Sequence, residues 1–116
     1  NPRAMMPGPV PDGAAVRLFP VHGERLGIAE GIETAWRASM RFGLPVWAAI
    51  NATMMAKWTP PVGVKEVVIF GDNDPLFGGQ AATFALAHNL AARKRLMVTP
   101  MIPETVGRDW ADEDAA

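Results

Sequence analysis

The hydrophobic positions of this chain fall into four short apolar runs, separated by stretches with helical spacing. The runs cover residues 26–29, 46–50, 66–70 and 96–101. Residues 66–70 read Glu-Val-Val-Ile-Phe, and their β-branched side chains between turn residues are typical of a strand buried on both faces. The pattern therefore predicts four strands.

The stretches between these runs predict three helices, at residues 32–42, 51–58 and 79–94. Asn51 is expected to cap the start of the second helix. In the first helix, apolar and small residues recur at a helical period and predict the buried face: Ile32, Ala35, Trp36, Ser39 and Met40.

Three of the four tryptophans, Trp36, Trp47 and Trp58, are expected to lie in or beside the core. Trp110 is expected to be exposed.

Strand and helix alternate along the chain, which is typical of a parallel sheet with right-handed crossovers and helices on both faces. The predicted fold class is α/β, a three-layer α/β/α Rossmann-like arrangement around a mainly parallel four-stranded sheet. Residues 1–23 contain five of the 11 prolines. They are expected to form the end of a preceding region, with at most a short strand near residues 16–19. Residues 24–116 then form the domain.

Composition excludes several kinds of function. The chain has 116 residues, with 11 Lys and Arg against 12 Asp and Glu, so its net charge of −1 does not fit a module that coats duplex nucleic acid. It contains no Cys and no Tyr, and Ser39 is its only serine, which excludes disulfides, thiolate zinc sites and thiol nucleophiles. No apolar run approaches the roughly 18 residues of a membrane span. We expect a cytoplasmic protein without a membrane partner.

Carboxylates follow the predicted strands at the points where the strands end. Glu30 follows the first strand, Asp72 and Asp74 follow the third, and Asp109 and Asp112 follow the fourth. The carboxyl ends of parallel strands meet at one edge of the sheet, where α/β proteins bind ligands. Two carboxylates about 4 Å apart repel each other by roughly 4 kcal/mol at an effective dielectric constant of 20. Such a group therefore needs a raised pKa or a divalent cation, and oxygen ligands favour Mg²⁺ or Mn²⁺ over zinc.

A structural explanation competes with a metal site at residues 72–75. Their sequence, Asp-Asn-Asp-Pro, also favours a turn, and without Glu30 the turn would be the better interpretation. In an extended chain Asp72 and Asp74 project to the same side and Asn73 points away. Residues 78–80, Gly-Gly-Gln, match no phosphate-binding fingerprint and are expected to be a flexible start to the following helix.

Three segments taken together carry a family resemblance. Residues 29–34 read Ala-Glu-Gly-Ile-Glu-Thr, residues 70–74 read Phe-Gly-Asp-Asn-Asp, and residues 107–112 read Gly-Arg-Asp-Trp-Ala-Asp. In this order and spacing they resemble the Toprim domain, which bacterial primases, type IA and type II topoisomerases and some nucleases share. More narrowly, these segments together with residues 7–10, 15–18 and 46–49 resemble the Toprim region of primase or primase-helicase-like replication proteins from phages, plasmids and other mobile elements.

The resemblance implies a role for each acidic residue. Glu30 would act as general acid or base and would bind Mg²⁺ together with Asp72 and Asp74, and Asp109 and Asp112 would add metal ligands. Bacterial primases tend to place an Asp four residues after the motif glutamate, whereas this chain has Thr34 there and Glu33 one position earlier. That shift of one position turns the carboxylate about 100° around the helix axis. Glu33 therefore does not match the position of the second acidic residue in bacterial primases.

The expected function is Mg²⁺-dependent nucleotidyl transfer, the synthesis of an RNA primer, by the catalytic domain of a DNA primase-like replication protein. The expected partners are a single-stranded DNA template, nucleoside triphosphates, and neighbouring zinc-binding or helicase domains in the full-length chain. A Toprim-type nuclease, a topoisomerase-related DNA-cleaving domain and a non-catalytic Toprim-like module remain alternatives. A phosphoacceptor receiver domain is excluded, because adjacent acidic residues after the first strand and a lysine after the last are both missing.

Overall fold

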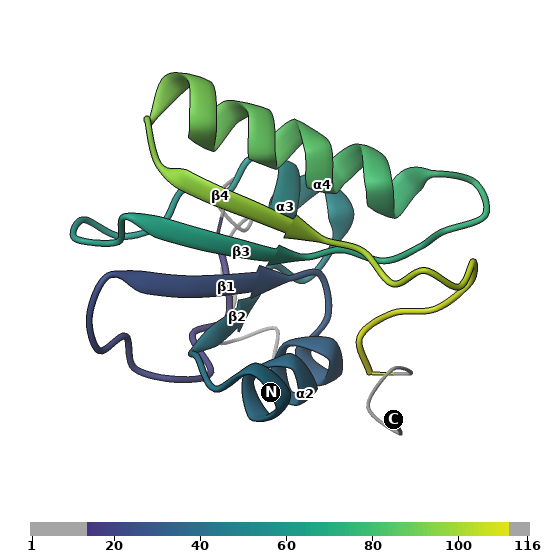
Figure 1. Ribbon diagram of the computed structural model, residues 1–116, viewed down its shortest axis with the longest axis horizontal. Coiled ribbons are helices and arrows are strands. Elements are labelled where there is room, and N and C mark those ends of the chain that lie inside the picture. The colour runs from purple at the N-terminus through teal and green to yellow at the C-terminus, as the bar shows by residue number, and fades with distance from the viewer. Residues whose placement is uncertain (1–13, 112–116) are drawn as a thin grey trace, which may run out of the picture.

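Four parallel strands form one sheet at the centre of the computed structural model, which describes residues 14–111 (Figure 1). The strands are β1 (Arg25–Ala29), β2 (Val46–Ala48), β3 (Glu66–Phe70) and β4 (Met97–Met101), in the order β2-β1-β3-β4. β1 and β3 are the two central strands, and each is paired on both sides. All four predicted strands are confirmed, although β2 and β4 are shorter than expected.

Helices cover both faces of this sheet, which confirms the three-layer α/β/α prediction. α2 (Ile32–Phe42) packs on one face, and α3 (Ala52–Ala56) and α4 (Gly78–His88) pack on the other (Figure 1). α4 continues into a π-helical turn at Asn89–Arg93. No helix within residues 14–111 has the length and apolar character needed to cross a membrane.

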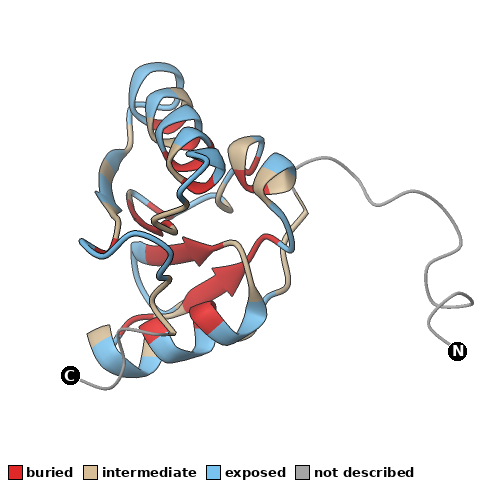
Figure 2. Cartoon of the chain, turned by 90° about the vertical axis from the view of Figure 1, so that its right-hand side faces the viewer, coloured by how far each residue is buried: buried red, intermediate tan, exposed pale blue. Residues whose placement is uncertain are grey.

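The core follows the two-residue alternation of the strands. Leu26 and Ile28 of β1 point toward α3 and α4, whereas Val68 and Phe70 of β3 point toward α2. All four side chains are buried, and Figure 2 shows the buried residues concentrated on the strands other than β4 and on the inner sides of the helices. The central strands are thus buried on both faces, as their continuous apolar sequence predicts.

The buried face of α2 differs from the predicted one. Of the five predicted residues, Ala35 alone is buried, and Thr34 and Ala38 accompany it. Ile32, Trp36 and Met40 are 54%, 52% and 67% exposed. The small residues face the sheet because Phe70 and its neighbours already fill the space between the layers. The large side chains are left on the outer side of the helix.

Trp110 is also placed differently from the prediction. It is partly buried, its Nε1 donates a 3.0 Å hydrogen bond to the Met101 carbonyl, and its ring packs edge-on against Phe42 and Phe70. Trp47 and Trp58 are buried as expected.

The segment before β1 packs against the sheet. Val16 forms an isolated antiparallel bridge with Ala48, through N–H to carbonyl distances of 2.7 and 3.1 Å, so the short strand expected near residues 16–19 amounts to a single bridge. Residues 1–13 lie outside the described part of the chain, and the boundary between residues 23 and 24 stays a prediction.

Candidate functional site

The carboxyl ends of the two central strands bring Glu30 and Asp72 to the same edge of the sheet. Ala29 and Phe70 are partners in the pairing of β1 with β3, so the residues that follow these strands emerge side by side. Glu30, Asp72 and Asp74 are all half-buried and line one cavity of about 250 Å³, together with Asp109. The fold thus gathers four of the five predicted site residues. Asp112, the fifth, lies outside the described residues.

Glu30 is electrostatically perturbed in this cavity. Partial burial raises the pKa of its carboxyl, and the nearby negative charge of Asp74 raises it further. Both causes disfavour the ionised form, and a bound cation would offset both. Glu30 can therefore hold a proton at a higher pH than an ordinary surface glutamate.

The residues that line the cavity fit Mg²⁺ by chemistry, since their carboxylate oxygens are the ligands this ion prefers. Among residues 14–111, however, no three acidic or histidine side chains are close enough together to form a ready-made metal site. Mg²⁺ is commonly held by one or two carboxylates with water and substrate phosphates in its remaining positions, and this arrangement matches such a partial set. Glu33 is exposed on α2 and does not line the cavity.

The loop between β3 and α4 fixes the position of the two aspartates. Asp74 Oδ1 accepts a 2.9 Å hydrogen bond from the Leu76 N–H. This bond closes the turn that the sequence offered at residues 72–75 as the alternative to a metal site. The side-chain amide of Gln80 makes two hydrogen bonds to the backbone of Asp74. Its Oε1 accepts from the Asp74 N–H at 3.2 Å, and its Nε2 donates to the Asp74 carbonyl at 3.1 Å. The turn and the acidic cavity thus coexist.

The start of α4 is closely packed at Gly79, and residues 78–80, expected to be a flexible start to the helix, form its first turn. Gly79 is buried, and a Cβ atom built there would lie 2.8 Å from the Asp72 carbonyl oxygen. Only glycine allows the helix to approach the end of β3 this closely.

Asn73 ties the segment that follows β4 to this loop. Its Nδ2 donates to the carbonyl oxygens of Pro103 and Glu104, at 2.7 and 3.2 Å, and its Oδ1 accepts from Gln80 Nε2 at 3.0 Å. Asn73 is itself among the residues that line the cavity, and its side-chain amide is engaged in these three hydrogen bonds. Sequence reasoning missed its role and that of Gln80, because their partners come from elements far apart along the chain.

The segment held by Asn73 contributes two charged residues to the cavity, Arg108 and Asp109. Asp109 Oδ1 accepts a 2.9 Å hydrogen bond from the Ala111 N–H, so one of its oxygens stabilises the local turn. Arg108 was not among the predicted site residues, although it stands within the Gly-Arg-Asp sequence that was.

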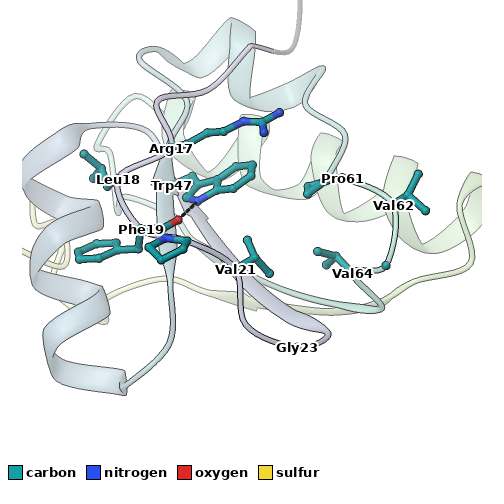
Figure 3. A pocket seen from close by; sticks show the side chains of 11 residues that line it. Arg17, Leu18, Phe19, Val21, Gly23, Trp47, Pro61, Val62 and Val64 are labelled. Carbon is teal, nitrogen blue, oxygen red and sulfur yellow. Dashed lines mark hydrogen bonds between the residues drawn. The ribbon is translucent and has the colours of Figure 1, made fainter.

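A second cavity of about 440 Å³ lies between the segment before β1 and the loop before β3 (Figure 3). Trp47 lies in its wall and donates from Nε1 to the Phe19 carbonyl at 2.8 Å, with the Arg17 guanidinium 4.8 Å from the ring centre. Among the described residues that line it, none is acidic, so it offers no carboxylate to a metal ion.

Comparison with known proteins identifies the family of the chain. Residues 25–114 match the family described as the Toprim domain, and the match spans all four strands together with Glu30, Asp72, Asp74 and Asp109. Searches of curated proteins and of solved structures give no match. Toprim domains occur in primases, nucleases and topoisomerases, are often catalytic, and generally bind Mg²⁺. Because the match covers most of its length, the chain belongs to the Toprim domain family.

Proposed function

We propose that this domain catalyses Mg²⁺-dependent nucleotidyl transfer, the synthesis of an RNA primer, within a DNA primase-like replication protein. The observation that supports the proposal most is that Glu30, with its raised pKa, shares one cavity with Asp72 and Asp74. A proton acceptor and two Mg²⁺ ligands are the parts that this reaction requires from the protein.

Each residue has a defined task in the proposed reaction. The 3′-hydroxyl oxygen of the growing primer attacks the α-phosphorus of a nucleoside triphosphate, pyrophosphate leaves, and the hydroxyl proton passes to the Glu30 carboxylate. Asp72 and Asp74, together with Glu30, would hold Mg²⁺, with Asp109 and Asp112 as further ligands. When bound, the ion would supply positive charge to offset that on the phosphates and on the attacking oxygen. The packing of Gly79 against Asp72 and the bonds of Gln80 to the loop keep these carboxylates in place.

The charge of the chain bears on its partners. With a net charge of −1, this domain has no excess of cations to hold a nucleic acid backbone. We propose that a single-stranded DNA template and nucleoside triphosphates bind at the acidic cavity through Mg²⁺. Neighbouring zinc-binding or helicase domains of the full-length protein would then supply the remaining affinity for the template.

The test is a comparison of Glu30→Gln with Glu33→Gln, which removes the same charge from an exposed position outside the cavity. The protein is incubated with Mg²⁺, labelled nucleoside triphosphates and single-stranded DNA, and both extension products and cleavage products are measured. Loss of a general base lowers the rate by roughly 10²- to 10⁴-fold. We therefore expect Glu30→Gln to abolish primer synthesis and Glu33→Gln to retain it.

The other outcomes separate the alternatives. Cleavage of DNA without extension, lost in Glu30→Gln, would replace the primase proposal with a Toprim-type nuclease or a topoisomerase-related activity. Binding of Mg²⁺ without either product would identify a non-catalytic module. Equal activity of the two variants would remove Glu30 from the reaction.

A further inference from the structure

Arg108 introduces a positive charge into a cavity that is otherwise acidic. Within residues 14–111, it is the one basic side chain among those that line the cavity, alongside Glu30, Asp72, Asp74 and Asp109. A guanidinium stays protonated at any pH the protein meets, so its charge is permanent.

The backbone of Arg108 is fixed to the loop that carries the two aspartates. Its carbonyl oxygen accepts a 2.9 Å hydrogen bond from the Asn73 N–H, and the neighbouring Gly107 N–H donates to the Asn73 carbonyl. The Asn73 side chain adds two bonds to the same segment, at Pro103 and Glu104. Asn73, which lies between Asp72 and Asp74 in the sequence, thus holds the Arg108 segment at the cavity.

A permanent cation at this place opposes the binding of Mg²⁺, because like charges repel and the guanidinium already neutralises part of the acidic field. It favours, however, a ligand that brings negative charge with the metal. The four acidic residues that line the cavity carry −4 when ionised, and Mg²⁺ contributes +2. The occupied site would then still repel a phosphate chain, and the +1 charge of Arg108 reduces that excess. Arginine also matches the geometry of phosphate oxygens through two parallel N–H bonds.

We propose that Arg108 binds the phosphate chain of a metal-bound di- or triphosphate, and that Asn73 is the positioning residue that holds Arg108 at the cavity. The proposal rests on the proposed function for the presence of the metal. It adds a polyphosphate-binding residue that the acidic motif does not include.

The test is calorimetric titration of Arg108→Gln, first with Mg²⁺ alone and then with inorganic pyrophosphate at saturating Mg²⁺. Arg93→Gln, which removes the same charge from an exposed residue near the opposite edge of the sheet, is the control. For Arg108→Gln we expect Mg²⁺ to bind more tightly, by about threefold, because a competing cation has gone. We expect pyrophosphate to bind more weakly, on the order of tenfold, because a charge-assisted hydrogen bond is lost. The control should change neither affinity.

The opposite signs of these two shifts separate a role in binding from a structural role. If Arg108 only stabilised the fold, its replacement would weaken both affinities together, and that result overturns the proposal. Unchanged pyrophosphate affinity with normal Mg²⁺ binding also overturns it, while leaving the proposed function intact. Failure of the unmodified protein to bind Mg²⁺ would instead remove the proposed function, and this inference with it.

The role of Asn73 is tested by coupling. Asn73→Ala removes the side-chain bonds to Pro103 and Glu104, so it should weaken pyrophosphate binding in the otherwise unmodified protein. In a protein that already carries Arg108→Gln it should cause little further loss, because the two residues act as one unit. Equal losses in both backgrounds would show that Asn73 does not act through Arg108.

Discussion

The packing of α4 on the end of β3 gives a prediction that can be worked out from distances. Gly78 and Gly79 are adjacent in the first turn of α4 but face different surroundings. A Cβ at Gly79 would lie 2.8 Å from the Asp72 carbonyl oxygen and 3.0 Å from the Asp72 Cβ. A Cβ at Gly78 would meet only the end of the Asp74 side chain, at 3.0 Å from Oδ2. Alanine at position 79 therefore displaces backbone, whereas alanine at position 78 displaces the end of a side chain.

These distances set the expected energies. An ordinary contact begins at 3.4 Å, so Gly79→Ala requires Asp72 and α4 to separate by about 0.6 Å. Overpacking of this kind costs about 1–3 kcal/mol, partly offset by up to ~1 kcal/mol from the better helix propensity of alanine. Gly78→Ala gains the same propensity with little steric cost. We expect the free energy of unfolding of Gly79→Ala to be lower than that of Gly78→Ala by about 1–3 kcal/mol.

The assay is urea unfolding of both variants, followed by Mg²⁺ titration. Because the displaced atoms belong to Asp72, we expect Gly79→Ala to lose Mg²⁺ affinity along with stability. Because Gly78→Ala touches the carboxylate of Asp74, a proposed ligand, the Mg²⁺ affinity of Gly79→Ala is compared with that of the unmodified protein. If Gly79→Ala unfolds at the same urea concentration as Gly78→Ala and binds Mg²⁺ as the unmodified protein does, the close approach of α4 to Asp72 does not constrain the site, and the reasoning is refuted.

Three further predictions concern single side chains. The raised pKa of Glu30 means that the metal-free fold loses stability as pH rises from the unfolded-state value of about 4.5 through the folded pKa. In the presence of a chelator, Glu30→Gln should therefore have a higher free energy of unfolding than the unmodified protein at pH 7, but not at pH 4. The same difference in free energy of unfolding at both pH values would contradict this. Thr83 is fully buried, and its Oγ1 has no hydrogen-bond partner among the described residues, so Thr83→Val should raise the free energy of unfolding by about 1 kcal/mol while Thr83→Ser lowers it. A loss of stability in Thr83→Val would show that the hydroxyl has a partner. Asn51 Oδ1 accepts from the Met54 N–H at the start of α3, so Asn51→Ala should cost about 1 kcal/mol in urea unfolding and Asn51→Asp much less, and equal losses would argue against a capping role.

The sequence predicts the sheet well because each strand carries its own signal. β1 and β3 are continuous apolar runs that end in turn residues, and the rule that parallel strands meet at their carboxyl ends places Glu30 beside the Asp72 to Asp74 loop without any further information. The motif residues could be found from the sequence because they directly follow these strands.

The rest could not be predicted because it depends on how the layers fit together. The outer position of Trp36 on α2 follows from the volume of Phe70 beneath the helix, which helical periodicity does not contain. The bonds of Asn73 and Gln80 join loops whose proximity exists only after the sheet has formed. The one sequence signal for Asn73 and Gln80 was that each is a polar residue near the acidic motif. That signal does not distinguish a metal ligand from a residue that holds a loop in place.

The paramagnetic effect of Mn²⁺ on the amide NMR spectrum tests most directly whether Glu30, Asp72 and Asp74 bind one cation together. Substoichiometric Mn²⁺ should broaden the amide signals of residues around positions 30, 72 and 74 at the same metal concentration, and an excess of Mg²⁺ should restore them. The broadening should disappear in Asp72→Asn. Broadening confined to the acidic residues 112–114, or broadening near position 72 without any near position 30, would contradict a shared site.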